Sequence, residues 1–588
     1  MSRRSGLTPA FSLLLLIPGG CLFGQAASKG FWYVSPAHVS LGTTVEANLV
    51  GKQVDDVEQF YVTRPGIKAR LIARGKVSFA VAPDAPIGDG DLWALGSGRL
   101  GAPARLTVGR VPTHKEAEPN STPAQAEELV LPVTVSGKID PGTDSDWYRV
   151  RLKAGDGLTI ACRSASLGGT VQPALVVLDP LGREVAHDTL TQGEPTVHVT
   201  AVDGGTYAIG VQDRSFRATA LPEYQLSLTV GPWVLGAYPP TLQRGQSQTV
   251  TLYGYGLHSS EPCPGHGALR RQTVDVTAPD VALPADRGWV LSRSLFVDSW
   301  EYWPAEAGGS VRWELLDRPL ADAANETPSA GPAEARRREL PFDVVHRFTS
   351  PREAVHWYRF SAQAGQTYWI EAVSERIDRA CDLELIVHSS DGKPLATLGN
   401  LTTPKELVTR VPLDSRDPAG VWKAPADGEY LLAVRDLLSL PTTTPAERAY
   451  RLSMGPQREE VRVVAQLDEN ASGGWTVEAG GSLSLALTVV RRGGQDSPIQ
   501  VEAEGVPAGL SVPAVRIERG ASQGVLLIRA DKDAPPCLGP IRLMVRAEAK
   551  GEPVTTEVRP ASGASSGSPA TSRFYDRLVI AIVPKPGK

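Results

Sequence analysis

The sequence lacks a concentrated block of positive charge. Its 588 residues include 60 lysines and arginines against 65 aspartates and glutamates, so the formal net charge is −5. A protein that binds the phosphate backbone of nucleic acids needs clustered basic side chains. We therefore expect no nucleic-acid partner.

Long apolar runs are also missing beyond the N-terminal segment. A transmembrane helix needs about 20 mainly apolar residues, so we expect no transmembrane segment. At the N-terminus, two arginines precede the apolar run 11–17 and small residues follow it. This pattern predicts an export signal over residues 1–27 and hence a secreted, periplasmic or cell-surface protein. Cys21 leaves a lipoprotein as the alternative.

Cysteine is scarce, with five residues in the whole chain. The four that follow the export signal are far apart, whereas a disulfide framework places pairs of cysteines within one domain. We expect buried or loop thiols at these positions. They are Cys162, Cys263, Cys381 and Cys537.

Familiar catalytic motifs are absent as well. The sequence contains no His-Glu-x-x-His, no phosphate-binding loop and no dinucleotide fingerprint. A Gly-x-Ser-x-Gly match at 563–567 lies in a Ser/Gly-rich stretch. A nucleophile elbow needs a strand before it and a helix after it, and neither is expected there. The sequence therefore predicts a protein that is not an enzyme.

What the sequence does contain is many short strand signals. Segments such as 248–253, 383–388 and 482–490 are rich in Val, Leu and Thr and are bounded by turn residues. No long stretch has a convincing helical period. The pattern predicts an all-β protein built from tandem β-sandwich modules, immunoglobulin-like and jelly-roll-like, in series.

The chain also repeats itself. Asp146-Trp147-Tyr148-Arg149-Val150 with Ala154-Gly155 parallels His356-Trp357-Tyr358-Arg359-Phe360 with Ala364-Gly365. A shorter Pro…Gly…Leu-x-Gly pattern at 36–51 recurs at 239–254. Such repeats indicate modules in series, each with a small core of its own.

Three motifs occur in order between residues 115 and 231. They are Glu116-x-Glu118-Pro119-Asn120-Ser121, Ser136-Gly137-x-Ile139 and Asp144-Ser145-Asp146-Trp147-Tyr148. On these residues the segment resembles the pre-peptidase C-terminal (PPC) domain family, β-sandwich modules found beside secreted bacterial peptidases. It is also similar to the collagen-binding modules of clostridial collagenases. Residues 340–456 resemble the same family from Trp357 onward, without the Glu-x-Glu-Pro-Asn entry.

The repeats and the resemblance together predict five modules after the export signal, and residues 28–110 and 232–320 resemble immunoglobulin-like (IPT-type) modules. The predicted units are an Ig-like β-sandwich at 28–110, a PPC-like β-sandwich at 111–231, an Ig-like β-sandwich at 232–338 that ends in a linker over 321–339, a degenerate PPC-like β-sandwich at 339–456 and an Ig-like β-sandwich at 457–588.

The strongest candidate site is a calcium site in the first PPC-like segment. Ca²⁺ takes six to eight oxygen ligands, typically carboxylates and carbonyls. Glu116, Glu118 and Asn120 alternate on an extended connector, and Asp144 and Asp146 alternate just ahead of a strand. The resemblance to the collagenase modules implies that these five residues hold Ca²⁺ jointly. The alternative is a solvated acidic linker in which Asp146 caps a turn.

The second PPC-like segment departs from this pattern. Ala354 stands where the first segment has Asp144, and His356 stands where it has Asp146. Because histidine is a poor ligand for Ca²⁺, we expect no calcium there.

Aromatic residues crowd one further stretch, at Trp289, Trp300, Tyr302, Trp303 and Trp313. Exposed aromatic side chains can stack on sugar rings or anchor a partner, and buried ones fill a sandwich core. The core role is the favoured interpretation.

The function predicted from the sequence is a secreted, modular, non-catalytic binding or structural protein. Its partner would be an extracellular or envelope polymer or protein, for which the modules serve as adhesive surfaces or spacers. The alternative is a secreted peptidase or a peptidase-associated accessory subunit, because PPC modules accompany peptidases.

Overall fold

The structure is a computed structural model. It describes residues 32–585 except 52–53, 189–193, 217–220, 281–293, 323–328, 330, 350–352, 354, 406, 408–410, 439–441, 468–474 and 563–572. The predicted export signal with Cys21, the Gly-x-Ser-x-Gly match, Trp289 and Ala354 therefore lie outside the described residues.

Strands make up nearly all the regular structure of the described residues, so the predicted all-β fold is confirmed. The helical elements among them are single 3₁₀ turns, such as η1 (Pro123–Gln125) and η2 (Ala165–Leu167). In strand β13 (Ser145–Leu152), Asp146, Tyr148 and the following alternate residues are buried while their neighbours are more exposed. This is the period of two expected for a strand that covers a core. None of the described helical elements could cross a membrane.

The first module spans residues 32–109 and has sheet orders β1-β3-β6-β5 and β2-β9-β7-β4, with β8 beside β7. Its strands are β1 (Trp32–Ser35), β2 (His38–Ser40), β3 (Thr44–Gly51), β4 (Val57–Val62), β5 (Ile67–Ala73), β6 (Lys76–Val81), β7 (Gly88–Gly96), β8 (Arg99–Leu100) and β9 (Ala104–Gly109).

The second module spans residues 113–230 and has sheet orders β10-β12-β19-β14-β17 and β11-β13-β18-β15-β16. Besides β13, its strands are β10 (Thr113–Lys115), β11 (Glu127–Glu128), β12 (Val133–Lys138), β14 (Gly157–Arg163), β15 (Pro173–Leu178), β16 (Glu184–Asp188), β17 (Thr196–Thr200), β18 (Gly205–Asp213) and β19 (Glu223–Val230).

The third module spans residues 233–316 and has sheet orders β20-β22-β24-β23 and β21-β26-β25. Its strands are β20 (Trp233–Tyr238), β21 (Thr241–Gln243), β22 (Ser247–Tyr255), β23 (Glu261–Pro262), β24 (Arg270–Thr277), β25 (Ser299–Tyr302) and β26 (Val311–Leu316).

The fourth module spans residues 321–456 and has sheet orders β27-β29-β37-β31-β35-β34 and β28-β30-β36-β32-β33. It also contains the 3₁₀ turns η5 (Pro332–Glu334) and η6 (Glu375–Ile377). Its strands are β27 (Ala321–Asp322), β28 (Arg336–Arg337), β29 (Phe342–Arg347), β30 (Val355–Ala362), β31 (Thr367–Val373), β32 (Leu383–Ser389), β33 (Pro394–Leu398), β34 (Asn400–Leu401), β35 (Ser415–Lys423), β36 (Gly428–Asp436) and β37 (Ala449–Pro456).

The segment predicted as an exposed linker, 321–339, contributes two strands to the fourth module. β27 pairs in parallel with β29, and β28 pairs in parallel with β30. The second module begins in the same way, because β10 and β11 pair in parallel with β12 and β13. Pairing with a neighbouring strand thus decides the structure of β27 and β28, although the composition around them favours a loop.

The fifth module spans residues 460–583 and has sheet orders β42-β44-β40-β38-β47 and β39-β48-β45-β41-β43, with β46 beside β45. Its strands are β38 (Glu460–Leu467), β39 (Thr476–Glu478), β40 (Ser482–Arg492), β41 (Ile499–Glu504), β42 (Leu510–Ser511), β43 (Val515–Ile517), β44 (Gln523–Ala530), β45 (Cys537–Ala549), β46 (Glu552–Glu557), β47 (Arg559–Ser562) and β48 (Leu578–Val583).

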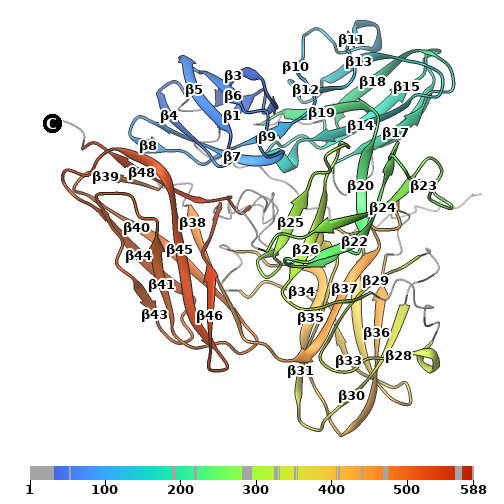
Figure 1. Ribbon diagram of the computed structural model, residues 1–588, viewed down its shortest axis with the longest axis vertical. Coiled ribbons are helices and arrows are strands. Elements are labelled where there is room, and N and C mark those ends of the chain that lie inside the picture. The colour runs from blue at the N-terminus through green and yellow to red at the C-terminus, as the bar shows by residue number, and fades with distance from the viewer. Residues whose placement is uncertain are drawn as a thin grey trace, which may run out of the picture.

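The modules do not form an open string. In Figure 1 the fifth module, in red, lies beside the first, in blue, although they stand at opposite ends of the described chain. The second, fourth, first and third modules have hydrophobic clusters of their own, as the repeats predict. The core of the fifth module differs, because it includes Trp93, Leu95 and Leu100 of the first.

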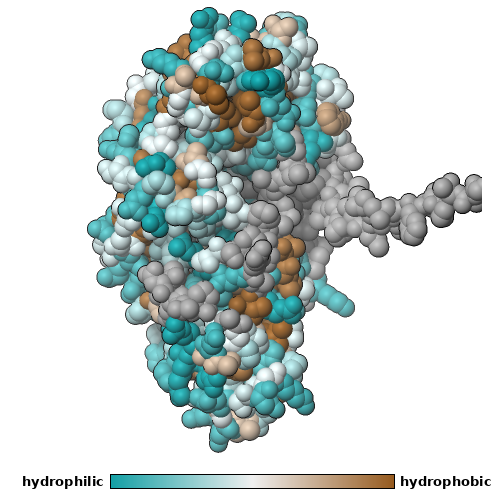
Figure 2. Space-filling view, turned by 90° about the vertical axis from the view of Figure 1, so that its right-hand side faces the viewer, coloured by the Kyte–Doolittle hydropathy of each residue, from teal (hydrophilic) through white to brown (hydrophobic). Residues whose placement is uncertain are grey.

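The surface is mostly hydrophilic on the face that Figure 2 presents, and apolar side chains gather there in separate patches. Several large apolar residues of the second module are well exposed. Among them are Val130, Leu181 and Val202, which are 86%, 74% and 84% exposed.

Candidate functional site

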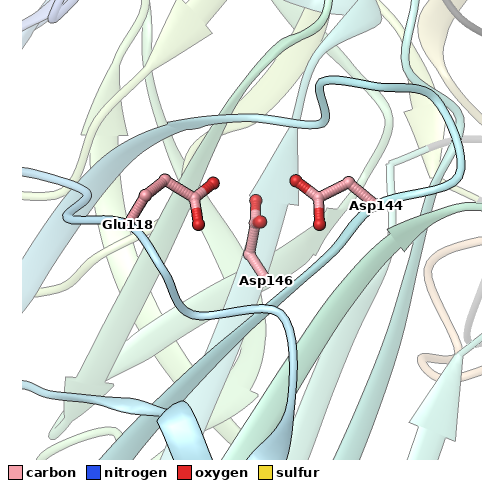
Figure 3. A group of neighbouring side chains, drawn as sticks. All are labelled: Glu118, Asp144 and Asp146. Carbon is pink, nitrogen blue, oxygen red and sulfur yellow. The ribbon is translucent and has the colours of Figure 1, made fainter.

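Three of the five predicted calcium ligands meet at one end of the second module. Oxygen atoms of Glu118, Asp144 and Asp146 all lie within 4.8 Å of one another. Figure 3 shows their carboxylates converging from two segments: Glu118 comes from the connector after β10, and Asp144 and Asp146 come from the turn before β13 and the start of that strand. Glu118 is exposed, Asp144 is half-buried and Asp146 is buried. The cluster is thus open to solvent on one side.

Backbone hydrogen bonds hold the two segments together. The amide of Trp147 donates to the carbonyl of Asn120 over 2.8 Å, and the hydroxyl of Ser145 donates to the carbonyl of Ser121 over 3.3 Å. The amide of Asp144 closes its turn by donating to the carbonyl of Pro141. The connector therefore lies across the start of β13, which places Glu118 beside both aspartates.

Asn120 is the fourth member of the cluster and is fully buried. In one orientation its side-chain amide directs the oxygen at the surrounding acceptors. In the other, its nitrogen donates to Asp146 Oδ1 over 3.3 Å and to Glu118 Oε2 over 3.0 Å. The first orientation adds an oxygen ligand for a cation, and the second neutralises part of the repulsion among the carboxylates when no cation is bound.

Asp146 is the most constrained of the carboxylates. The hydroxyl of Tyr224 on β19 donates to Asp146 Oδ2 over 2.6 Å. Burial, followed by the negative charges of Glu116, Asp144 and Glu118, raises the pKa of Asp146 to about 9. Without a cation this group therefore holds a proton at neutral pH.

Glu116, the first predicted ligand, lies behind the cluster and contributes no atom to the three-carboxylate group. Its Oε1 accepts from the backbone amide of Lys138 over 2.8 Å. Its Oε2 accepts from the hydroxyl of Tyr148 over 3.3 Å and lies 3.4 Å from the hydroxyl oxygen of Tyr224. Burial raises the pKa of Glu116 to about 7.

The two tyrosines belong to the candidate site, although the sequence did not predict them as part of it. Their hydroxyls lie 2.6 Å apart and join Glu116 to Asp146. The available signal was their recurrence, since Tyr148 and Tyr224 match Tyr358 and Tyr450 in the second PPC-like segment. Gly137 faces the same pair, and a Cβ there would collide with the ring of Tyr224 and lie 2.6 Å from Glu116 Oε2.

The fourth module carries histidines at the equivalent place. His356, on the second residue of β30, contacts the hydroxyl of Tyr450 through Nδ1 at 2.6 Å and Glu353 through Nε2 at 3.0 Å. The ring of His346 stacks on that of His356 with centroids 4.1 Å apart. His346 pairs with Tyr450 across the sheet, where the second module pairs Gly137 with Tyr224.

The other candidate residues have structural roles. Trp313 is fully buried, and Trp300 and Tyr302 pack against it with ring centroids 5.7 and 5.5 Å away. These three serve the core of the third module, as the favoured interpretation predicted. Trp303 packs against the first module, where its Nε1 lies 2.7 Å from a Cβ placed at Gly88.

The four described cysteines are free thiols. Three are buried and Cys537 is half-buried. They are therefore free of disulfides, in keeping with their spacing in the sequence.

Comparisons with known proteins were made with the family models, the curated proteins and the solved structures. No family model and no curated protein matches the chain. Among solved structures, the pre-peptidase C-terminal domain of a collagenase from Bacillus anthracis is 15% identical, with a TM-score of 0.15; the match covers 22% of this chain and 99% of that one.

Two further solved structures are similar at 8% identity. One is SGBP-B of the mixed-linkage glucan utilization locus of Bacteroides ovatus, in complex with a mixed-linkage heptasaccharide; the match covers 33% of this chain and 53% of that one, with a TM-score of 0.13. The other is a putative membrane anchored protein from Corynebacterium diphtheriae, with 92% and 97% covered and a TM-score of 0.13.

Proposed function

We propose that the protein is a secreted or cell-envelope, non-catalytic binding and structural protein whose second module binds Ca²⁺. The observation that carries the calcium site is the convergence of Glu118, Asp144 and Asp146 within 4.8 Å. Among the described residues, no lysine or arginine forms an ion pair with any of the three. Without a cation Asp146 holds a proton, and a bound cation would replace that proton and balance the three carboxylates.

The chemistry of the cluster favours calcium over softer metals. Carboxylate and amide oxygens are hard donors, which suit Ca²⁺, whereas Zn²⁺ favours imidazole and thiolate. The amide oxygen of Asn120 is the fourth donor, and water would complete the coordination on the open side next to Glu118. Glu116 supports the site through the tyrosine pair and adds negative charge behind Asp146.

Calcium would join the connector to the start of β13. The connector is otherwise attached there by a few hydrogen bonds to Asn120 and Ser121. Because the ion would bind the folded module and not the unfolded chain, it should raise the stability of that module. A stabilising ion of this kind suits a protein that works outside the cytoplasm.

The proposed binding role is supported by the surface as well as by the lack of catalytic motifs. Val130, Leu181 and Val202 expose apolar area on the same module. The partner class that we propose is an extracellular or envelope polymer or protein, and a peptidase-associated accessory subunit remains the second candidate because of the PPC-like motifs.

Calorimetry on the whole chain tests the calcium site. Ca²⁺ should bind to the wild type, and Glu118→Gln and Asp144→Asn should weaken binding at least tenfold. The matched control is Glu128→Gln, which changes an exposed carboxylate of the same module that pairs with Arg149 and Arg151. Binding heats that are the same in all four proteins would remove the site.

The partner class has a separate test. The whole chain should be retained on at least one of a panel of insoluble polysaccharides, collagen and envelope extracts, with and without Ca²⁺. Retention on none of them would contradict the binding role. Turnover of casein or mixed glycans by the purified chain would instead establish an enzyme.

A further inference from the structure

Strand β7 of the first module is buried on both of its faces. Eight of its nine residues, Gly88 to Leu95, are buried. Leu92 and Ala94 belong to the core of the first module itself. Trp93 and Leu95 point the other way and belong to the core of the fifth module. The alternation of a strand thus divides β7 between two hydrophobic cores.

The apolar half of this contact is aromatic. The ring of Trp93 lies 5.6 Å from that of Trp475 and 5.3 Å from that of Tyr575, measured between centroids. The second distance belongs to an edge-to-face pair, which is a favourable geometry for aromatic rings. Trp93 is fully buried in this position. On a separated first module the same side chain would lie on the surface.

The polar half is a reciprocal pair of aspartates. The amide of Asp91 donates to Asp576 Oδ2 over 3.1 Å, and the amide of Asp576 donates to Asp91 Oδ2 over 2.8 Å. These two residues are 485 positions apart in the chain. The hydroxyl of Thr63 also donates to Asp576 Oδ2 over 2.6 Å.

Two arginines balance the charge of the aspartate pair. Arg573 of the fifth module donates to Asp91 Oδ1 over 2.7 Å and to the carbonyl of Pro103 over 2.8 Å. Arg105 of the first module lies 3.0 Å from Asp91 and 3.6 Å from Asp576. All of these side chains are buried, so salt screens them little.

The same strand also holds the second module. Asp89, two residues before Asp91, accepts from both terminal nitrogens of Arg163, at 2.5 and 3.2 Å. Arg105 lies 3.8 Å from Asp89 and so stands between the two contacts. The second and fifth modules are therefore attached to one short stretch of the first.

We infer that β7 is a latch that closes the five modules into a ring. When its contacts are broken, the fifth module separates from the first as a folded unit and stays attached to the third and fourth modules through the ion pairs of Arg559 with Asp298 and of Arg492 with Glu371. The released state would expose Trp93 and Leu95 on one side and Trp475 and Tyr575 on the other. Each side would keep the rest of its own core, because the sheets of the two modules share no strand. The latch does not depend on calcium binding.

Two variants of the whole chain test the latch from its two sides. Trp93→Ala removes the apolar contact from the first module, and Arg573→Met removes a charge from the fifth. The control is Arg519→Ala, which breaks an exposed ion pair with Asp496 elsewhere on the fifth module. X-ray scattering in solution gives the radius of gyration, and hydrogen exchange reports which strands stay protected.

In both latch variants we expect a larger radius of gyration, faster exchange in β7, β8 and β48, and unchanged protection of β38, β40 and β44. The control should match the wild type. A radius of gyration that stays at the wild-type value in both variants would overturn the inference. Loss of protection throughout the fifth module in Trp93→Ala would also overturn it, because the two modules would then fold as one.

Discussion

The second and fourth modules have equivalent sheet orders but place opposite chemistry against the same pair of tyrosines. In the second module, Tyr148 and Tyr224 face two carboxylates, the buried Asp146 and the half-buried Glu116. In the fourth, Tyr358 and Tyr450 face two stacked histidines. The tyrosine pair therefore belongs to the framework of both modules, and the groups around it vary independently.

The difference shows which of the two clusters is complete without a ligand. In the fourth module His356 engages both ring nitrogens, one with Tyr450 and one with Glu353. In the second module Asp146 faces Glu118 and Asp144, so its surroundings carry charge of one sign. Buried charge of one sign is costly unless a partner neutralises it. The second module alone thus has a reason to bind a cation.

The largest expected effect comes from Gly137. Its fourth-module counterpart is His346, yet a Cβ at Gly137 would collide with the buried ring of Tyr224. Because overpacking of a buried site costs about 1–3 kcal/mol, Gly137→Ala should destabilise the second module by about 3 kcal/mol. Hydrogen exchange of β12 and β19 in the whole chain measures this loss.

The matched control for that variant is Gly204→Ala in the same module. A Cβ at Gly204 would meet its nearest neighbour at 3.5 Å, an ordinary contact. This variant should change stability little. Equal effects of the two substitutions would show that the space beside Tyr224 does not distinguish the second module from the fourth.

The next largest expected effect is the loss of the stabilisation of the second module by Ca²⁺. Asp146→His gives the second module the residue that the fourth has at this position, and it should abolish the stabilisation by Ca²⁺. At a concentration of 100 Kd that stabilisation is about 2.7 kcal/mol. Thermal unfolding with Ca²⁺ and with a chelator measures it, and a variant that still responds like the wild type would refute the site.

The reverse variant, His356→Asp, tests whether a single carboxylate at this position is enough to give the fourth module a calcium site. One new carboxylate beside Glu353 does not rebuild a group like Glu118, Asp144 and Asp146. We therefore expect no calcium response from the fourth module and a loss of stability there, because Tyr450 and Glu353 lose their imidazole partner. A calcium-dependent gain in protection of β30 would contradict this expectation.

Acidity should act on the two modules in opposite directions. Burial raises the pKa of Asp146 from its ordinary value of 3.8 to about 9. The protonated Asp146 therefore contributes fully to the stability of the second module below pH 3.8, and this contribution is lost as the pH rises toward 9. Burial lowers the pKa of His346 to about 3. The neutral His346 therefore contributes fully to the stability of the fourth module above pH 6.5, and this contribution is lost as the pH falls.

Hydrogen exchange at a series of pH values, with a chelator present and after correction for intrinsic exchange rates, tests this contrast. Between pH 5 and 8, protection of β13 should decline with rising pH while protection of β30 increases. Glu353 acts only below this range: its hydrogen bonds with His356 and Thr349 outweigh burial and lower its pKa to about 2, so its contribution to stability is lost as the pH falls below 4.5. Slopes of the same sign in the two modules would contradict the assignment of the two clusters.

The composition and turn residues of the sequence predicted the strands. The grouping of Glu118 with Asp144 and Asp146 was implied by the resemblance to the collagenase modules, because alternation places residues on one side of a segment but does not say which segments meet. Asn120 was among the predicted ligands, but the sequence predicted neither its complete burial nor the contact of Tyr224 with Asp146. Tyr224 reaches Asp146 from a strand 78 residues later, and its contact depends on the register of β19. The burial of Asn120 depends on how the connector folds over β13.

The packing of β7 against the fifth module also could not be predicted from local sequence patterns. Strand β7 has apolar residues on both faces, a pattern that also fits a strand in the middle of one core. Nothing in its periodicity says that the second face belongs to a module more than 350 residues away. The prediction of modules in series is therefore incomplete, because it describes the repeats and misses the closure of the first module against the fifth.

The smallest expected effect is a change of a few times in calcium affinity, and it shows whether the tyrosine pair acts on the calcium site as well as on the fold. Tyr224→Phe and Tyr450→Phe each remove one buried hydroxyl, and each should cost about 1–3 kcal/mol because a buried partner loses a hydrogen bond. Only Tyr224→Phe should also change calcium affinity, since this hydroxyl orients Asp146 Oδ2. We expect calcium binding a few times weaker in Tyr224→Phe and unchanged in Tyr450→Phe, as measured by calorimetry. Equal affinities in both variants would reduce the tyrosine pair to a purely structural element in the second module, as it is in the fourth.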